Sequence, residues 1–178
     1  MDVVVEEKFP LHWMNFQEEP NTMEHLRRIT ANEEVLRAIS VMEDPRLELN
    51  EEHERSSDIQ RIESKVNIVL DLVALLARQS SQLPLMYPTR LAATFIEWQS
   101  SAAPQDGQSV IVQVYLSVKY PRPLQLVGIA EAMATDSIFN CRVNLSSAGE
   151  VQQDLLEKYI FRQHRRRVAL ERRNNNPV

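Results

Sequence analysis

Glycine is scarce in this chain of 178 residues, and the three glycines, Gly107, Gly128 and Gly149, lie far apart. Loops that cradle phosphate groups need clustered glycines, so P-loop and dinucleotide-binding folds are excluded. Cysteine is scarcer still, because Cys141 is the only one. A single cysteine excludes an intrachain disulfide framework and a cysteine-based zinc cluster, and it is typical of a reducing compartment.

Long uninterrupted apolar runs are also missing. The first residues, MDVVVEEK, lack the basic and apolar regions of a signal peptide. The longest apolar stretch is interrupted by Asn67 and Asp71, so it does not form a transmembrane helix. We therefore expect a cytoplasmic protein without membrane insertion.

No pattern of catalytic or metal-binding residues stands out. The chain has no G-x-S-x-G motif, and Cys141 alternates with apolar residues in a way that predicts a core position. The histidines have no metal-site spacing; they are His12, His25, His53 and His164. We expect neither an enzyme nor a metal site.

Charge is distributed unevenly along the chain. Residues 1–157 carry 13 basic and 24 acidic side chains, whereas residues 158–178 carry 7 basic and 1 acidic. The basic end could bind nucleic acid, bind a phosphorylated ligand, or dock on an acidic neighbour subunit, and we favour the third. For the arginines at 162–173 we favour covering of the sheet or pairing with the acidic body over nucleic-acid binding, because Tyr159 and Phe161 are the only aromatic residues near them.

A heptad pattern occupies residues 57–83. Its apolar residues are spaced by 3, 4, 3, 4 and 3 positions: Ile59, Ile62, Val66, Val69, Val73 and Leu76. These six residues are the predicted oligomer interface, and β-branched residues at both core positions favour three or four strands over two. The alternative is an ordinary amphipathic helix that packs on the core of its own chain.

A second apolar stripe runs along the same segment through Ile68, Leu72 and Leu75, with Leu70 beside the heptad positions. A helix that is apolar almost all round is buried on more than one side. We therefore expect one face to join an intersubunit bundle and the other to contact a partner within the chain.

The rest of the chain reads as short strands and flanking helices. Strands are expected within 3–16 and at 90–98, 110–118, 124–133 and 138–145, and helices at 22–43 and after the capping box Ser147-x-x-Glu150. Asn32 is a candidate second helix cap that would divide 22–43 into two helices. Residues 43–58 form an acidic linker. Successive strands with short turns indicate an antiparallel sheet or barrel.

This order resembles a PilZ domain. The marks are Pro123-Leu124-Gln125-Leu126-Val127-Gly128 and the closing helix LLEKYIFRQHRRR at 155–167. The segment FPLHW at 9–13, the acidic linker and the heptad helix resemble the atypical, tetramer-forming branch of this family. The resemblance implies an α+β fold, with an antiparallel PilZ-like β-barrel and long additional helices that form an intersubunit four-helix bundle.

The resemblance also implies a division of the chain. Residues 1–20 would be an N-terminal β segment of the barrel, and 21–83 a helical oligomerisation region containing the linker 43–58. Residues 84–173 would form the barrel and closing helix, and 174–178 a disordered tail.

PilZ domains bind cyclic di-GMP through an RxxxR loop near the N-terminus and a [DN]xSxxG motif in an early strand. Here the second motif would fall at residues 90–95, which read RLAATF. Arg90, Ala92 and Phe95 replace the acidic or amide residue, the serine and the glycine, and no RxxxR precedes the first β segment. We therefore expect no cofactor and no binding of cyclic di-GMP in the usual way.

Both motif spacings recur elsewhere. Asn144, Ser146 and Gly149 fit [DN]xSxxG, and Arg162 and Arg166 fit RxxxR. One interpretation is that Ser146 and Gly149 begin a helix; the alternative is a relocated anion site at its N-terminus.

Three functional hypotheses follow from these observations. The first is a regulatory or scaffold protein, most simply a homotetramer, that binds an unidentified protein of bacterial signalling or motility. The second is a genuine cyclic di-GMP receptor with a relocated site. The third, which we consider weakest, is a nucleic-acid binder that uses the arginine-rich C-terminal helix.

Overall fold

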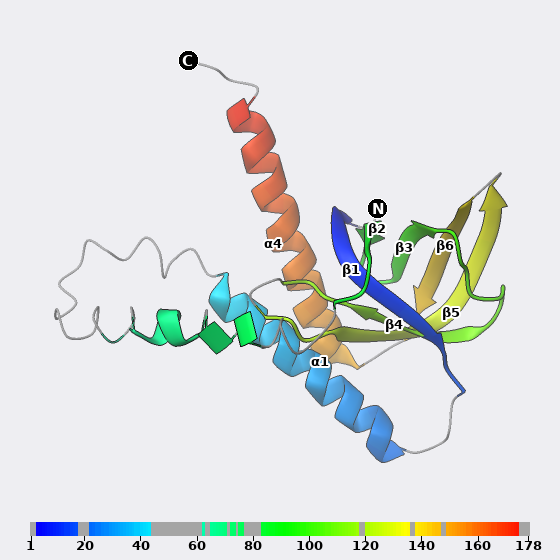
Figure 1. The fold of residues 1–178 in the computed structure, drawn as a ribbon, viewed down its shortest axis with the longest axis horizontal. Coiled ribbons are helices and arrows are strands. Elements are labelled where there is room, and N and C mark those ends of the chain that lie inside the picture. The colour runs from blue at the N-terminus through cyan, green and yellow to red at the C-terminus, as the bar shows by residue number, and fades with distance from the viewer. Residues whose placement is uncertain are drawn as a thin grey trace.

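The structure is a computed structural model of the chain, shown in Figure 1. It describes residues 3–17, 22–43, 62, 65–70, 72–73, 75–76, 83–117, 120–135, 138–146 and 149–174. The strands are β1 (Val5–Asn15), β2 (Met86–Leu91), β3 (Phe95–Ser100), β4 (Ser109–Val114), β5 (Leu124–Thr135) and β6 (Ile138–Leu145). The two long helices are α1 (Thr22–Met42) and α4 (Glu150–Asn174).

The six strands form a closed antiparallel barrel in the order β1-β2-β3-β6-β5-β4. Side chains alternate between the interior and the outside, as the period of two requires. On β4 the buried residues are Val110, Val112 and Val114, and on β6 they are Cys141 and Val143. The predicted α+β fold with an antiparallel barrel is therefore confirmed.

β1 closes the barrel by pairing with a different strand on each half of its length. Val5–Pro10 pair with β2, and Leu11–Asn15 pair with β4. Pro10 lacks an amide hydrogen, and it lies where the partner changes; its carbonyl accepts a hydrogen bond from the Tyr115 amide at 3.0 Å. An N-terminal segment thus pairs with strands more than 70 residues away.

The predicted strand at 90–98 is wrong, because β2 and β3 are two strands joined by a tight turn at Ala92–Thr94. The amide of Ala92 donates to the carbonyl of Phe95 at 2.9 Å. Leu91 and Ala92 are both buried on one side of this turn, and Phe95 and Ile96 on the other. This continuous apolar run contains no glycine or proline, so its sequence gave no turn signal.

The suggested helix break at Asn32 is also wrong, because α1 is continuous from Thr22 to Met42. The Asn32 side chain is buried, and it makes bonds across the fold instead of capping a helix. Its amide donates to the Gln125 carbonyl at 2.7 Å and to Oε1 of Gln152 at 3.1 Å, and its Oδ1 accepts from the Gln125 amide at 2.8 Å. One side chain therefore ties α1 to β5 and to α4.

The two helices cross and pack together against the barrel, and α4 continues well beyond it toward the C-terminus (Figure 1). Val35, Leu36 and Ile39 of α1 join the same buried cluster as Leu156 and Tyr159 of α4. Burial in this cluster raises the pKa of the Tyr159 hydroxyl above its ordinary value.

Substitution of Gly128 tests the register between β5 and β6. A β-carbon there would overlap the carbonyl oxygen of Asn144 and lie 2.7 Å from Cγ1 of Val143. We expect Gly128→Ala to lower the free energy of unfolding by ~3 kcal/mol, because β5 and β6 must separate to admit the methyl group. Urea denaturation measures this change.

Gly107→Ala is the matched control. Its β-carbon meets nothing within 4 Å, but its φ of 76° disfavours a side chain, so we expect a loss of only ~1 kcal/mol. Equal losses in the two variants would contradict the close approach of β5 and β6 at Gly128.

Candidate functional site

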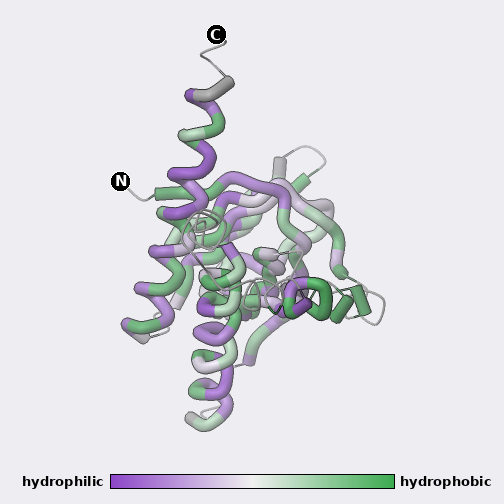
Figure 2. The backbone as a smooth tube through the Cα atoms, turned by 90° about the vertical axis from the view of Figure 1, so that its left-hand side faces the viewer, coloured by the Kyte–Doolittle hydropathy of each residue, from purple (hydrophilic) through white to green (hydrophobic). Residues whose placement is uncertain are grey.

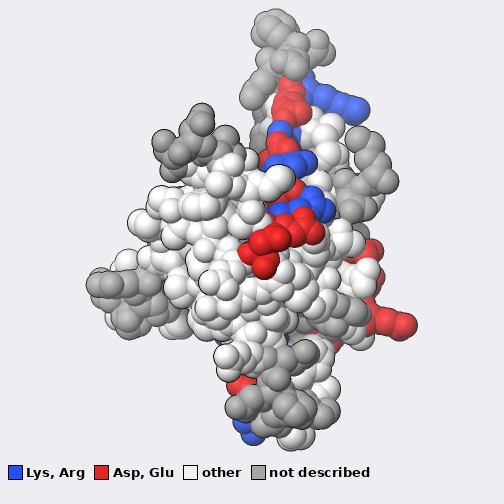
Figure 3. All heavy atoms as spheres, turned by 90° about the vertical axis from the view of Figure 1, so that its right-hand side faces the viewer, with Lys and Arg blue, Asp and Glu red and all other residues white. Residues whose placement is uncertain are grey.

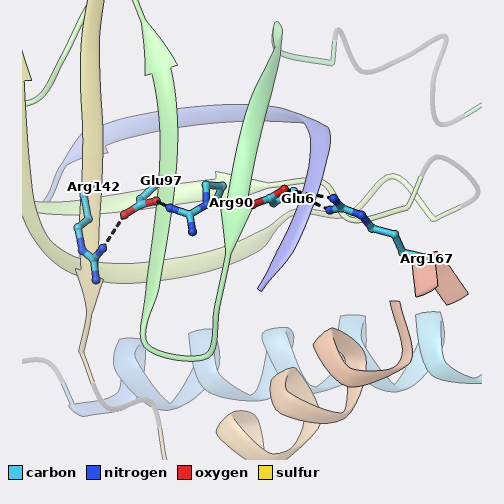
Figure 4. Close-up of polar contacts among 5 residues, drawn as sticks. All are labelled: Glu6, Arg90, Glu97, Arg142 and Arg167. Carbon is cyan, nitrogen blue, oxygen red and sulfur yellow. Dashed lines mark hydrogen bonds and ion pairs between the residues drawn. The ribbon is translucent and has the colours of Figure 1, made fainter. Parts of the chain in front are cut away.

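A row of alternating charges crosses the outside of the barrel on five neighbouring strands. Figure 4 shows its members on four of these strands, together with Arg167 of α4. We call these residues the charge row; they are Glu6 (β1), Arg90 (β2), Glu97 (β3), Arg142 (β6) and Glu131 (β5). Each member lies directly opposite the next in the strand register. Directly opposed side chains on one face of a sheet interact, and opposite charges stabilise the pairing.

Ion pairs link most of the charge row. Nη1 of Arg90 lies 2.6 Å from Oε2 of Glu97, and Nε of Arg90 lies 3.3 Å from Oε1 of Glu6. Nη1 of Arg142 lies 2.5 Å from the other oxygen of Glu97. Asn144 connects the last two members, because it accepts from Arg142 at 3.0 Å and donates to Glu131 at 2.6 Å.

The row ends on α4, where Arg167 contacts Glu6 at 3.3 Å and Glu171 at 3.1 Å. Figure 3 shows acidic and basic side chains gathered in one band on a face that is otherwise largely uncharged. The basic C-terminal helix thus pairs with acidic residues of the same chain, as the interpretation we favoured from the sequence predicts.

A hollow of about 910 Å³ lies over the charge row. Its charged lining is nearly balanced, with four carboxylates (Glu6, Glu7, Glu97 and Glu131) and three cations (Lys8, Arg90 and Arg142). Arg90 and Arg142 are engaged with carboxylates, and Arg142 also lies 3.9 Å above the Phe95 ring. The hollow therefore offers a polyanion little net attraction.

The structure explains what replaced the expected [DN]xSxxG residues at 90–95. Arg90 belongs to the charge row, Ala92 is buried in the β2–β3 turn, and Phe95 lies beneath Arg142. The guanidinium of Arg90 is held by two carboxylates, so its hydrogen-bonding edge is occupied.

The residues of the suggested relocated site do not come together. Asn144 is bound to Glu131 and Arg142 on the barrel. The amide of Ser146 donates to the Val127 carbonyl at 2.8 Å, and Gly149 adopts a φ of 89° directly before α4. Arg162 lies 12 residues into α4, about 18 Å along its axis from Glu150.

Arg162 and Arg166 instead bind the C-terminal end of α1. Arg162 donates to the carbonyl of Ser40 at 3.0 Å and to its hydroxyl at 3.1 Å. Arg166 pairs with the Glu43 carboxylate at 3.2 Å and donates to the Glu43 carbonyl. The last turn of α1 has no basic residue of its own, so α4 supplies the cations that its carbonyls favour.

Glu7 is a functional candidate that the sequence did not indicate. Partial burial and the nearby Glu43 carboxylate raise the pKa of its carboxyl above 4.5. Glu7 also lines the hollow over the charge row. The pKa of Glu7 is raised by groups that only the folded chain brings near β1, so residue spacing in the sequence could not have shown it.

The heptad segment presents its apolar side chains to solvent. Its described residues are helical, and the large apolar ones among them are each 43–63 % exposed: Ile62, Val66, Ile68, Val69, Leu70, Leu72, Val73, Leu75 and Leu76. In Figure 2 they are drawn as short, predominantly green pieces, and in Figure 1 they lie on the side of α1 away from the strands. Ile59, the first predicted interface residue, lies outside the described residues.

One expectation about this helix is wrong. The second stripe does not pack on a partner within the chain, because Ile68, Leu72 and Leu75 are each at least half exposed. The barrel core is complete without them, since α1 and α4 supply its helical side chains. Among the described residues, both apolar stripes are therefore exposed in the single chain.

Within the described residues, no group of three or more histidine, cysteine or acidic side chains is placed to hold a metal ion. Burial raises the pKa of the Cys141 thiol to about 11, which disfavours the reactive thiolate. Among the described helices, none is long and apolar enough to cross a membrane.

Glu7 predicts a pH-dependent effect on stability. The pKa of Glu7 is raised above 4.5 in the folded protein. The free energy of unfolding therefore falls as pH rises from 4.5 through the raised pKa, because folding then partly buries an ionised carboxylate near Glu43. We expect Glu7→Gln to raise the melting temperature at pH 7 and to leave it unchanged at pH 4. Thermal denaturation at both pH values measures this.

The neighbouring Glu6→Gln is the control. It removes the pairs with Arg90 and Arg167, so we expect a slightly lower melting temperature at pH 7. A lower melting temperature for Glu7→Gln at pH 7 would show that Glu7 is stabilised as a carboxylate and would refute the prediction.

Comparison with known proteins agrees with this architecture. A solved structure from Xanthomonas campestris, described as a pathogenic protein with a tetrameric PilZ domain self-assembled through a helical bundle, aligns with a TM-score of 0.77 and 24 % identity over 94 % of this chain and 91 % of that one. An inhibitor of motility from Bacillus subtilis aligns over 44 % of this chain and 41 % of its own, with a TM-score of 0.37 and 14 % identity. No curated protein matches the chain.

The family comparison covers most of the sequence. The model of the atypical PilZ domain, described as a cyclic di-GMP receptor, matches residues 36–173. This range contains the heptad segment, β2 to β6 and nearly all of α4. The chain therefore belongs to the atypical PilZ domain family.

Proposed function

We propose that this protein is a non-enzymatic regulatory scaffold of the bacterial cytoplasm that assembles through its heptad helix and acts by binding other proteins. The observation that carries the proposal is the exposure of two apolar stripes on one helix. Monomeric soluble proteins rarely expose a large contiguous apolar patch, and such a patch marks an interaction surface. A partner in bacterial signalling or motility would then meet several copies of the barrel at once.

The proposed oligomer is a homotetramer. Its interface consists of the heptad positions Ile59, Ile62, Val66, Val69, Val73 and Leu76. β-branched residues at both core positions favour more than two helices. The tetrameric helical bundle of the Xanthomonas campestris protein supports the same arrangement.

The proposed division of the chain follows from this assembly. Residues 21–83, including the acidic linker 43–58, serve oligomerisation, and residues 84–173, completed by the β segment within 1–20, form the barrel unit. Residues 174–178 are a tail. The pairing of β1 with β2 and β4 supports the place of the N-terminal segment in the barrel unit.

We further propose that cyclic di-GMP is not bound in the usual way and that the protein has no cofactor. Arg90 and Arg142 are held by carboxylates, and Arg162 and Arg166 are held by α1. A ligand with two phosphates would have to displace these partners. The same pairing disfavours the nucleic-acid alternative, because Arg166 and Arg167 are engaged within the chain.

The assembly is tested by placing charges in the heptad seam. We expect Val66→Lys with Val73→Lys to convert the oligomer into monomers or aggregates, because two lysines per helix would have to be buried in the bundle core. Light scattering coupled to size-exclusion chromatography measures the mass of the assembly.

Asn67→Lys with Ala74→Lys is the control, because it adds the same charges one residue further along the heptad, at b positions outside the predicted a and d seam. We expect this variant to keep the oligomeric mass of the wild type. If the seam variant also kept that mass, the helical bundle would be rejected.

Calorimetric titration with cyclic di-GMP tests the ligand proposal. We expect no binding up to ~100 μM ligand, because the two arginines of the RxxxR spacing, Arg162 and Arg166, already have carbonyl or carboxylate partners. Micromolar binding would contradict this proposal. If Arg162→Ala then abolished that binding while circular dichroism stayed unchanged, the relocated site would be supported.

A further inference from the structure

A second hollow lies where α1, the first turns of α4 and the barrel meet. Its volume is about 510 Å³, within the range of small-molecule sites. Ile29 of α1, Leu126 of β5 and Leu156 of α4 contribute apolar wall. The hollow is separate from the charge row, and the proposed assembly does not use it.

Arg28 is the only lysine or arginine that lines this hollow, beside His25, and it has no acidic partner among the described residues. Arg28 is half-buried, and its only recorded interaction is with the Phe16 ring, 4.7 Å from the ring centroid. By contrast, Arg37, Arg90, Arg122, Arg142, Arg166 and Arg167 all form ion pairs. Stacking on Phe16 fixes the guanidinium plane and leaves its N–H edge available to an anion.

A buried amide also lines the hollow. Gln152 is only 4 % exposed, and its Oε1 accepts the hydrogen bond from Asn32. Its Nε2 donates no hydrogen bond within the described part of the chain. Asn32 holds the amide in place, because Asn32 is itself fixed by two hydrogen bonds to the backbone of Gln125. Because Gln152 lines the hollow, its Nε2 offers a hydrogen-bond donor to an acceptor on a ligand.

We propose that this hollow binds a small organic anion with one negative charge and an apolar body. Arg28 would pair with the carboxylate or other acidic group, Gln152 Nε2 would donate to an acceptor on the ligand, and the aliphatic wall would contact the body. A single charge matches the single guanidinium in the lining, whereas a dinucleotide with two phosphates has no second arginine there. This site is independent of the proposed assembly and of the charge row.

The test uses 2-naphthoate as the probe and the full-length oligomer, with ligand-detected NMR as the readout. We expect a Kd on the order of 1 mM, as is typical for a ligand of this size. The neutral analogue 2-naphthamide, which has the same ring without the charge, is expected to bind at least about tenfold more weakly, because one charge-assisted contact is lost.

Arg28→Gln locates the site. We expect it to weaken 2-naphthoate binding about tenfold, and we expect the adjacent Arg27→Gln to change it by less than about twofold. Arg27 is the matched control because it lies on the same helix, carries the same charge and does not line this hollow. Circular dichroism and light scattering confirm that both variants keep the fold and the oligomeric mass.

Several outcomes would overturn the proposal. Absence of binding at 10 mM probe, equal affinity for the neutral amide, or equal weakening by Arg27→Gln would each reject a specific anion site at Arg28. Binding of cyclic di-GMP that Arg28→Gln abolishes would reject the single-charge class. The mass of the assembly is measured separately, so failure of this site and failure of the proposed oligomer are distinguishable.

Discussion

The pairing of β1 with strands on both of its sides is the constraint on which the rest of the structure depends. Without β1, strands β2 and β4 would be open edges of a sheet. Its register also decides which side chains meet on the outside, because a shift of one residue would turn Glu6 away from Arg90. The same closure fixes the start of β2, the strand to which the chain returns after the heptad segment.

Contacts between α4 and the end of α1 form the second constraint on the fold. Arg162 and Arg166 hold the last carbonyls of α1, after which the chain continues toward the heptad helix. Arg162 and Arg166 match the spacing of a ligand-binding RxxxR motif, but residues four apart on a helix simply share a face. Here that face lies against another helix, so the spacing serves packing between α1 and α4.

The ion pairs of the charge row and the proposed oligomer interface therefore lie on different parts of the molecule. The charge row neutralises itself across five strands and reaches Arg167 on α4, which leaves no unbalanced field for a polyanion on that face. Exposed ion pairs of this kind each add little to the free energy of unfolding. Here they place opposite charges on directly opposed residues of neighbouring strands, and they give Arg90 and Arg142 carboxylate partners. The described apolar residues of the heptad segment are each 43–63 % exposed in the single chain.

The sequence by itself determined the elements with strong periodic signals. β6 has the predicted bounds of 138–145, because strict alternation is a local property. α4 begins at Glu150, directly after Gly149 with its φ of 89°, so Glu150 is not the third residue of the helix as the predicted capping box requires; Ser147 lies outside the described residues. The exposure of the heptad helix is consistent with the predicted interface, and the interface itself stays a prediction. Only the tertiary structure decided the turn inside 90–98, the bridging role of Asn32, the raised pKa of Glu7 and the partners of Arg28, Arg162 and Arg166. Each of these depends on groups that are distant in the chain, and local spacing contains no information about which distant group will supply a hydrogen bond, a charge or a buried wall.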